Sequence, residues 1–302
     1  MSFELLDSAY QRMRQYLNSL GGTSADFIPM SMGYPEPGEF LLPSNVIKAL
    51  SVTMEDGCEK PRPGYGWPSR ATELKENLVY LENTLHRTNY STDNICLVAG
   101  ATYAFNRICE QLFLSTHLNN KNILIVAPTY FWMHNQLKYY AQVKTVVGSE
   151  QNDFQITPEE ILNSIDGDTI AVFIANPSNP TCLYYSDDFF NELVPQLENK
   201  NIYLIIDESG DAFNVATGKE RLRPFPSILD NPYVIRLVTA SKKYLLAEYR
   251  IGYVLATGLL PALKLGSYKV RKSALDDFLL QHEGQDLTNP RNISTITVEE
   301  NA

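Results

Sequence analysis

The chain has 302 residues, of which 44% are hydrophobic and 20% are charged, as is usual for a soluble globular protein with a large core. A formal net charge of −10 argues against a nucleic-acid-binding or anionic-membrane-binding surface, so an anionic ligand needs a local cationic pocket. The four cysteines form no CxxC pair, which suits a reducing compartment and gives no metal signature. Without a signal-peptide pattern or a long apolar run, we expect a cytoplasmic protein.

The first part of the chain predicts helices separated by loops. Amphipathic spacing indicates a helix over residues 4–19, and a short helix is expected over 43–50. Segments rich in Gly and Pro predict loops at 28–38 and 61–68. A further helix is expected over roughly 70–86.

From residue 94 onward, predicted strands alternate with predicted helices. Apolar runs predict strands over 94–99, 122–127, 143–147, 169–175, 202–206, 234–238 and 251–255. Helices are predicted over 100–113, 131–140, 157–165, 187–197 and 262–282. This alternation predicts an α/β fold, a three-layer sandwich in which helices cover both faces of a mostly parallel sheet.

Polar residues follow the ends of five predicted strands, at Gly100–Thr102, Tyr130, Asn179, Asp207 and Lys242. Because the carboxyl ends of parallel strands share one edge of a sheet, we expect these residues to converge there. The strand-Gly-Ala-Thr-helix junction also offers free amide groups at the positive end of a helix, which can bind an anion. Many α/β turns of this kind bind nothing, so this junction is a weak signal by itself.

The most informative stretch surrounds Lys242. Arg250 comes eight residues later, and the hydroxyl groups of Thr239 and Ser241 flank the lysine. A nucleophilic amine, small hydroxyls and a fork-shaped guanidinium suit a site that holds a phosphorylated aldehyde as a Schiff base. The stretch alone leaves a second interpretation open, in which Lys242 and Lys243 are a lysine pair on a solvated turn.

Over about residues 28–300 the chain resembles the fold-type I enzymes that use pyridoxal 5′-phosphate (PLP), specifically the class I/II aminotransferases. The motifs that carry the resemblance are Asn-Pro-Ser-Asn-Pro-Thr at 176–181, Ser-Lys at 241–242, Leu-Ala at 246–247, Arg-x-Gly-Tyr at 250–253, and Tyr65 with Leu-Lys at 74–75. The resemblance implies a homodimeric aminotransferase that moves an amino group between an amino acid and a 2-oxo acid. PLP would be held as a Schiff base on Lys242.

The resemblance also implies roles for the residues around the phosphate and the reactive amine. Lys242, which alone of the two lysines keeps the family's spacing to Arg250, would carry the cofactor and move the α-proton of the substrate. The cofactor phosphate would be bound by Arg250, Ser241, Thr239, Gly100, Ala101 and Thr102.

Further roles implied by the resemblance concern the cofactor ring and the substrate. Asp207 would pair with the protonated pyridine nitrogen, although a helix cap is its alternative. Asn179 would hydrogen-bond the ring 3′-oxygen, or be a turn residue, and Tyr130 would stack on the ring, or pack in the core. Gly33 would let the substrate approach the backbone, and Tyr65 would reach the phosphate of the neighbouring subunit.

Four positions depart from the family pattern. Cys182 and Arg70 stand where glycine is usual, and Glu248 replaces the glycine two residues before the phosphate arginine. Gly210 replaces a tyrosine that often donates to the ring 3′-oxygen, which should open space in the pocket. Two alternatives therefore stay open: a fold-type I lyase, elimination enzyme or cyclase of amino-acid-derived metabolites, and a catalytically weak PLP-fold binding module.

The resemblance divides the chain into three parts. Residues 1–42 would contribute to a small domain and to the dimer interface, and residues 43–258 would form the large PLP-binding domain. Residues 259–302 would begin a C-terminal small domain that looks truncated. No residue here can be assigned as the arginine that binds the substrate carboxylate in the family, and the substrate cannot be read from the sequence.

Overall fold

The computed structural model describes Tyr16, Ser19, Ser44 and residues 46–48, 68–116, 121–140, 142–210, 226–244, 246–247 and 249–258. The isolated residues from 16 to 48 are helical, in line with the two helices predicted there. Outside the described residues lie the predicted loop at 28–38, nearly all of the predicted loop at 61–68 and the predicted helix at 262–282. Of the predicted domains, most of residues 1–42 and all of residues 259–302 also lie outside them.

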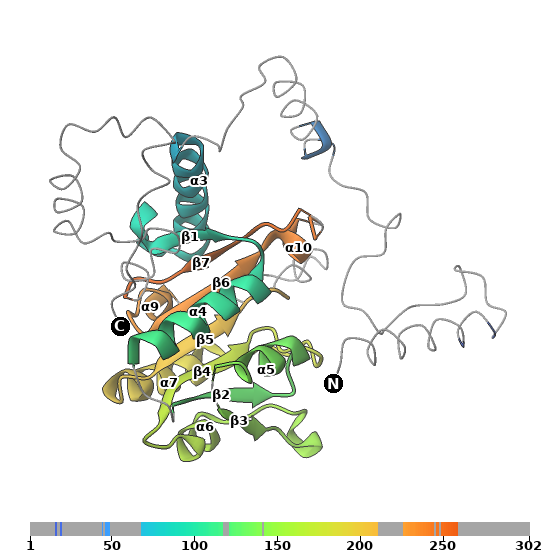
Figure 1. The fold of residues 1–302 in the computed structure, drawn as a ribbon, viewed down its shortest axis with the longest axis vertical. Coiled ribbons are helices and arrows are strands. Elements are labelled where there is room, and N and C mark those ends of the chain that lie inside the picture. The colour runs from blue at the N-terminus through green and yellow to red at the C-terminus, as the bar shows by residue number, and fades with distance from the viewer. Residues whose placement is uncertain are drawn as a thin grey trace, which may run out of the picture.

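The described residues form a seven-stranded sheet with the strand order β1-β7-β6-β5-β4-β2-β3 (Figure 1). The strands are β1 (Ile95–Val98), β2 (Asn122–Ala127), β3 (Gln142–Val147), β4 (Thr169–Ala175), β5 (Tyr203–Asp207), β6 (Val234–Thr239) and β7 (Gly252–Leu255). Every predicted strand is present, and the sheet is mostly parallel, as predicted. Only β7 runs the other way, antiparallel to both β1 and β6.

Helices fill the connections between the strands. They are α3 (Pro68–His86), α4 (Ala101–Thr116), α5 (Phe131–Leu137), α6 (Pro158–Ser164), α7 (Asp187–Asn199), α9 (Pro226–Leu229) and α10 (Ala240–Lys243), with short 3-10 turns η1 (Thr92–Asn94) and η2 (Glu150–Asn152). The five helices predicted from 70 to 197 are confirmed. α5 ends three residues earlier than predicted, because the amides of Tyr139 and Tyr140 donate to carbonyls only three residues back, at Gln136 and Leu137.

Two helices begin at side-chain caps that the sequence supplies. The Thr157 hydroxyl accepts from the Glu160 amide at 3.2 Å, and the Glu160 carboxylate accepts from the Thr157 amide at 2.8 Å, which is a capping box. Pro158 occupies the first turn of α6, where no amide donor is needed. At α7, the Ser186 hydroxyl accepts from the Phe189 amide at 3.2 Å.

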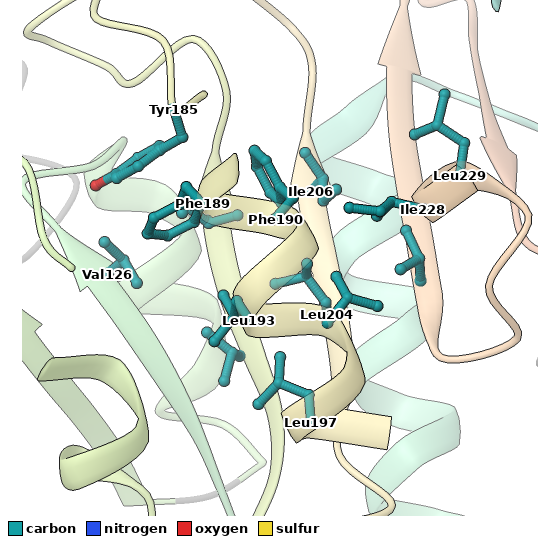
Figure 2. Packing of buried hydrophobic residues seen from close by; sticks show 14 of the residues in the cluster. Val126, Tyr185, Phe189, Phe190, Leu193, Leu197, Leu204, Ile206, Ile228 and Leu229 are labelled. Carbon is teal, nitrogen blue, oxygen red and sulfur yellow. The ribbon is translucent and has the colours of Figure 1, made fainter. Parts of the chain in front are cut away.

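The hydrophobic core lies on both faces of the sheet. Alternate residues of a strand point to opposite faces, so neighbours on one strand join different clusters. On one face, Phe190 of α7 packs with Leu204 and Ile206 of β5 (Figure 2). On the other face, Phe105 of α4 contacts Phe173 of β4, with ring centroids 4.8 Å apart. The predicted helix–sheet–helix layering is therefore confirmed.

Cys96, Cys109 and Cys182 are free thiols. Among the helices in the part of the chain that the structure describes, none is both long enough and apolar enough to cross a membrane. Across those same residues, no group of three or more His, Cys, Asp or Glu side chains could hold a metal ion.

Candidate active site

Polar residues from five strands meet at one edge of the sheet. β1, β2, β4, β5 and β6 all run in the same direction, because β1 and β6 are both antiparallel to β7 and the others pair in parallel. α5 and α10 lie at this edge (Figure 1). The carboxyl ends of these strands, and with them the backbone at Gly100, Asp207 and Lys242, therefore share one edge of the sheet as expected.

Lys242 lies in α10, directly after β6, and its side chain is half-buried. Burial lowers the pKa of its ammonium group; the Asp207 carboxylate acts to raise it and the Arg250 guanidinium to lower it, with a lowered pKa as the net result. The described residues offer its Nζ atom no hydrogen bond. A lysine with a lowered pKa is a better nucleophile and proton acceptor than a solvated one.

The neighbouring Lys243 acts on a different group. Its charge helps to lower the pKa of Glu82 in α3, whereas Lys242 is coupled to Asp207 and Arg250. The two lysines are therefore not an equivalent pair on a solvated turn. Lys242 belongs electrostatically to the edge of the sheet where the predicted site residues lie.

Asp207 is the last residue of β5 and is buried, with 6% of its surface exposed. Its Oδ1 atom accepts hydrogen bonds from the Ser209 amide at 3.0 Å and from the Ser209 hydroxyl at 2.5 Å. Burial raises the pKa of this carboxyl group, and the Ser209 hydrogen bonds and the Lys242 charge lower it only in part. The carboxyl is thus a buried acceptor with a neighbouring cation.

Tyr130 follows β2 and is half-buried. Burial raises the pKa of its hydroxyl group, the Asp207 charge raises it further, and the Arg250 charge lowers it, so the phenol lies within electrostatic reach of both residues. Its ring also packs against the core on the α4 face and meets Phe131 edge to face, with centroids 5.2 Å apart. Tyr130 therefore combines core packing with a place at the site.

Gly100 and Arg250 form a tight junction at the start of α4. Gly100 has a φ of +88°, and a Cβ atom there would lie 2.5 Å from Nη2 of Arg250. The guanidinium donates to the Ala247 carbonyl at 2.9 Å and to the Ala99 carbonyl at 3.3 Å. This arrangement places an exposed cation beside the free amide groups of a 16-residue helix, a site suited to an anion such as a phosphate.

The hydroxyls of Thr239 and Ser241 hold the turn that carries Lys242. Their oxygen atoms lie 2.9 Å apart, and the Thr239 hydroxyl accepts from the Ser241 amide at 3.2 Å. Thr239 also donates to the Ile251 carbonyl at 3.2 Å. Both hydroxyls therefore stiffen the link between β6 and Lys242.

The predicted site residues are not all brought together. Asn179 lies in the exposed loop after β4, and the structure describes no contact between it and Asp207 or Lys242. Ala101 is buried and Thr102 is half-buried, both in the first turn of α4. Gly33, Tyr65 and Glu248 lie outside the described residues.

A buried ionic cluster next to the site was not foreseen from the sequence. Arg236, in the middle of β6, is fully buried and contacts Glu82 of α3 at 2.9 Å. It also makes two hydrogen bonds to Glu208, at 2.5 and 2.8 Å, directly after Asp207. Tyr253 of β7 donates to Glu82 at 2.6 Å. We call these residues the Arg236 network; its one sequence signal is an arginine inside an apolar run.

The comparison with protein families settles which family this is. The profile of aminotransferase class I and II matches residues 28–274. The chain belongs to this family. Class I and II aminotransferases depend on PLP, so the cofactor expected from the sequence is the family's cofactor.

Individual aminotransferases resemble the chain more weakly. Aspartate aminotransferase of Geobacillus stearothermophilus is 26% identical over 254 residues, which cover 82% of this chain and 61% of that protein. Histidinol-phosphate aminotransferase of Leuconostoc mesenteroides is 30% identical over 63% of this chain and 49% of its own length. The chain thus spans between about half and three-fifths of the length of these two relatives.

Solved aminotransferase structures share the fold. Aspartate aminotransferase of Thermotoga maritima superimposes with a TM-score of 0.69 at 21% identity, covering 87% of this chain and 68% of that one. Alanine aminotransferase of Pyrococcus furiosus gives a TM-score of 0.66 at 22% identity over 87% of this chain and 61% of that one. The α/β fold expected from the sequence is therefore confirmed.

Two departures from the family pattern have local structural explanations. Cys182, which replaces a usual glycine, has a φ of +59°, in the region that glycine adopts most easily. At Gly210, a Cβ atom would lie 2.8 Å from Cγ of Pro177, so the glycine allows a close approach of the proline ring. The proline ring thus lies where the first side-chain atom of a larger residue at position 210 would be.

The residues at this edge fit PLP. The junction of Gly100 and Arg250 suits its phosphate, and the buried Asp207 carboxylate suits its protonated ring nitrogen. The charges of Asp207 and Arg250 both act on Lys242, and the pKa of Lys242 is lowered. An amine that reacts with an aldehyde must be neutral, which a lowered pKa favours.

Proposed function

We propose that this chain is a PLP-dependent aminotransferase that moves an amino group between an amino acid and a 2-oxo acid, with Lys242 as its reactive amine. The observation that carries the proposal is the placement of Lys242, Asp207 and Arg250 at one edge of the sheet, where β6 and β5 end and the antiparallel β7 begins. The lowered pKa of Lys242 and the family membership support it.

The phosphate end of the cofactor would be held by the cation and the amides at the start of α4. Arg250 presents a guanidinium beside the free amides of Gly100, Ala101 and Thr102. Ser241 and Thr239 would act mainly by holding the turn with Lys242, since their hydroxyls are engaged with each other and with the main chain.

The ring end would be held by Asp207, with Tyr130 and Asn179 as neighbours. When bound, PLP supplies an aldehyde that takes up the amino group and a ring that accepts electrons. The Asp207 carboxylate would keep the ring nitrogen protonated, which preserves that electron-accepting character. Asn179 would donate to the ring 3′-oxygen, and the Tyr130 ring would lie against the cofactor, as family membership suggests.

Lys242 would also carry a proton. Its Nζ atom would take the proton from the α-carbon of the amino acid that gives up its amino group. In the second half of the reaction it would give a proton to the α-carbon of the new amino acid. Burial and the Arg250 charge both favour the neutral amine, which is the form that can accept a proton.

The remaining parts of the proposal concern residues outside the described ones. Gly33 would let the substrate approach the main chain, and Tyr65 would reach the cofactor phosphate of a neighbouring subunit in a homodimer. We place this enzyme in the cytoplasm, with amino acids and 2-oxo acids as its small-molecule partners.

The first test is the visible absorption spectrum of the full chain with added PLP, before and after borohydride reduction, followed by peptide mass analysis. We expect a visible band and a reduced adduct on Lys242. Lys242→Ala should lose both, whereas Lys243→Ala, the matched control, should keep both. No band and no adduct in the unaltered chain, or an adduct on Lys243, would contradict the proposal.

A second measurement identifies the reaction. A ¹⁵N-labelled amino acid is incubated with the PLP-loaded protein and a 2-oxo acid, and the label is followed by mass spectrometry. Label in the new amino acid supports amino-group transfer. Label released as ammonia would support the elimination alternative. No turnover by unreduced protein that gave the Lys242 adduct in the first test would support the binding-module alternative.

A further inference from the structure

Ser209 makes two contacts with Asp207 that differ in what they require of the side chain. Its main-chain amide donates to Oδ1 of Asp207 at 3.0 Å, a bond that most residues at this position could make. Its hydroxyl donates to the same oxygen at 2.5 Å, which needs a serine or a threonine. The hydroxyl contact therefore depends on the side chain at residue 209, whereas the amide contact does not.

The two oxygen atoms of the Asp207 carboxylate are consequently not equivalent. Oδ1 accepts both bonds from Ser209, whereas the part of the chain that the structure describes donates no hydrogen bond to Oδ2. A carboxylate whose described donors both bind one oxygen keeps the other oxygen available as an acceptor.

We propose that Ser209 is a positioning residue that holds Oδ1 of Asp207 and thereby leaves Oδ2 as the acceptor for the ring nitrogen of PLP. This inference rests on the proposed function, because it assumes that Asp207 meets the cofactor ring. Ser209 itself need not touch the cofactor.

The surroundings of Asp207 explain why an extra donor matters. Burial raises the pKa of the Asp207 carboxyl, and the donors that oppose this effect are the Ser209 hydroxyl and amide, followed by the charge of Lys242. Tyr130 and Arg250 are the further titratable groups coupled to this site. Without the hydroxyl, the carboxyl is more easily protonated, and a protonated carboxyl cannot hold the proton on the ring nitrogen.

The main chain on either side of Asp207 is held without the Ser209 hydroxyl, which makes this role testable. Glu208 is anchored independently by two hydrogen bonds to Arg236, at 2.5 and 2.8 Å. The Asp207 main chain is also fixed, because its carbonyl accepts from the Asn176 amide at 2.9 Å. Removing the Ser209 hydroxyl should therefore change the carboxylate and leave the turn in place.

The test uses the full chain loaded with PLP that carries ¹⁵N in its ring, and compares Ser209→Ala with Ser209→Thr. The ¹⁵N chemical shift reports whether the ring nitrogen is protonated, and a PLP titration gives the dissociation constant. Ser164→Ala is the matched control, since Ser164 at the end of α6 also donates a hydroxyl bond, at 2.8 Å to the Glu160 carbonyl.

We expect Ser209→Ala to move the ¹⁵N shift towards the unprotonated value and to weaken PLP binding about tenfold, the scale of one hydrogen bond to a charged group. Ser209→Thr should restore both readouts, and Ser164→Ala should leave both unchanged. Unaltered shift and affinity in a folded Ser209→Ala protein would overturn the inference alone. An unaltered chain that binds no PLP would overturn the proposed function and this inference with it.

Discussion

At the scale of single residues, the candidate phosphate site depends on a close approach of main chain to guanidinium. Gly100 has a φ of +88°, and its missing side chain leaves room for Arg250. Gly252 is also close, since a Cβ atom there would lie 3.0 Å from the Gly100 Cα. Gly100 therefore leaves room for the cation, and Gly252 lets β7 approach the main chain before α4.

Gly100→Ala should both strain the main chain and displace Arg250. We expect a loss of about 1–3 kcal/mol in the free energy of unfolding, the cost of a side chain held in a rarely adopted conformation, together with weaker PLP binding. Urea denaturation and a PLP titration measure the two effects.

Gly167→Ala is the control for that substitution, because a Cβ atom at Gly167 has no neighbour within 4 Å. It should change the free energy of unfolding by no more than about 0.5 kcal/mol. Equal behaviour of the two variants would show that the junction of Gly100 and Arg250 is unimportant.

At the scale of the elements, β5 and β6 position the site, and the Arg236 network ties them to α3 and β7. Arg236 lies on β6. Its partner Glu208 directly follows β5, and its partner Glu82 lies in α3. The Tyr90 ring lies beside the guanidinium, 6.0 Å from ring centroid to Cζ. The strand ends that carry Asp207 and Lys242 thus share one buried ionic anchor.

Arg236→Met should leave the buried Glu82 and the half-buried Glu208 without their main cation. We expect the free energy of unfolding to fall by about 3–5 kcal/mol, as when one partner of a buried ion pair is removed. Thermal and urea denaturation measure the loss. The triple variant Arg236→Met, Glu82→Leu, Glu208→Leu should recover most of it, and a single variant as stable as the unaltered chain would show that the network contributes little.

At the scale of the whole molecule, the same network makes stability depend on acid. Burial acts to raise the pKa of Glu82, but the charges of Arg236 and His86 and the Tyr253 hydrogen bond lower it from 4.5 to about 2. A carboxyl group with a lowered pKa in the folded state binds protons more readily when unfolded. Its stabilising contribution is therefore complete above pH 4.5 and is lost as the pH falls towards 2.

Glu82→Gln should be less stable than the unaltered chain at neutral pH, and the difference should shrink as the pH falls from 4.5 towards 2. Urea denaturation at a series of pH values measures this difference. Glu159→Gln is the comparison, because Glu159 is exposed in the first turn of α6 and lies outside the Arg236 network. A difference between Glu82→Gln and the unaltered chain that stays constant with pH would contradict the expectation.

The sequence by itself determined the layers and the edge of the sheet at which the site lies. Apolar runs of strand length, with amphipathic helices between them, are local patterns, and all seven strands appear where they were predicted. The place of Asp207 and Lys242 at strand ends follows from the same patterns, and so does the helix start after Gly100. Their roles in binding PLP remain predictions.

Only the tertiary structure decided which side chains act on one another. Arg236 and Glu82 are 154 residues apart, and no local pattern shows that they pair. The same holds for the reversed direction of β7, the separate electrostatic partners of Lys242 and Lys243, and the close approach of Pro177 to Gly210. The physical reason is that periodicity reports how one segment faces the core, whereas these features depend on strand order and on close contacts between distant segments.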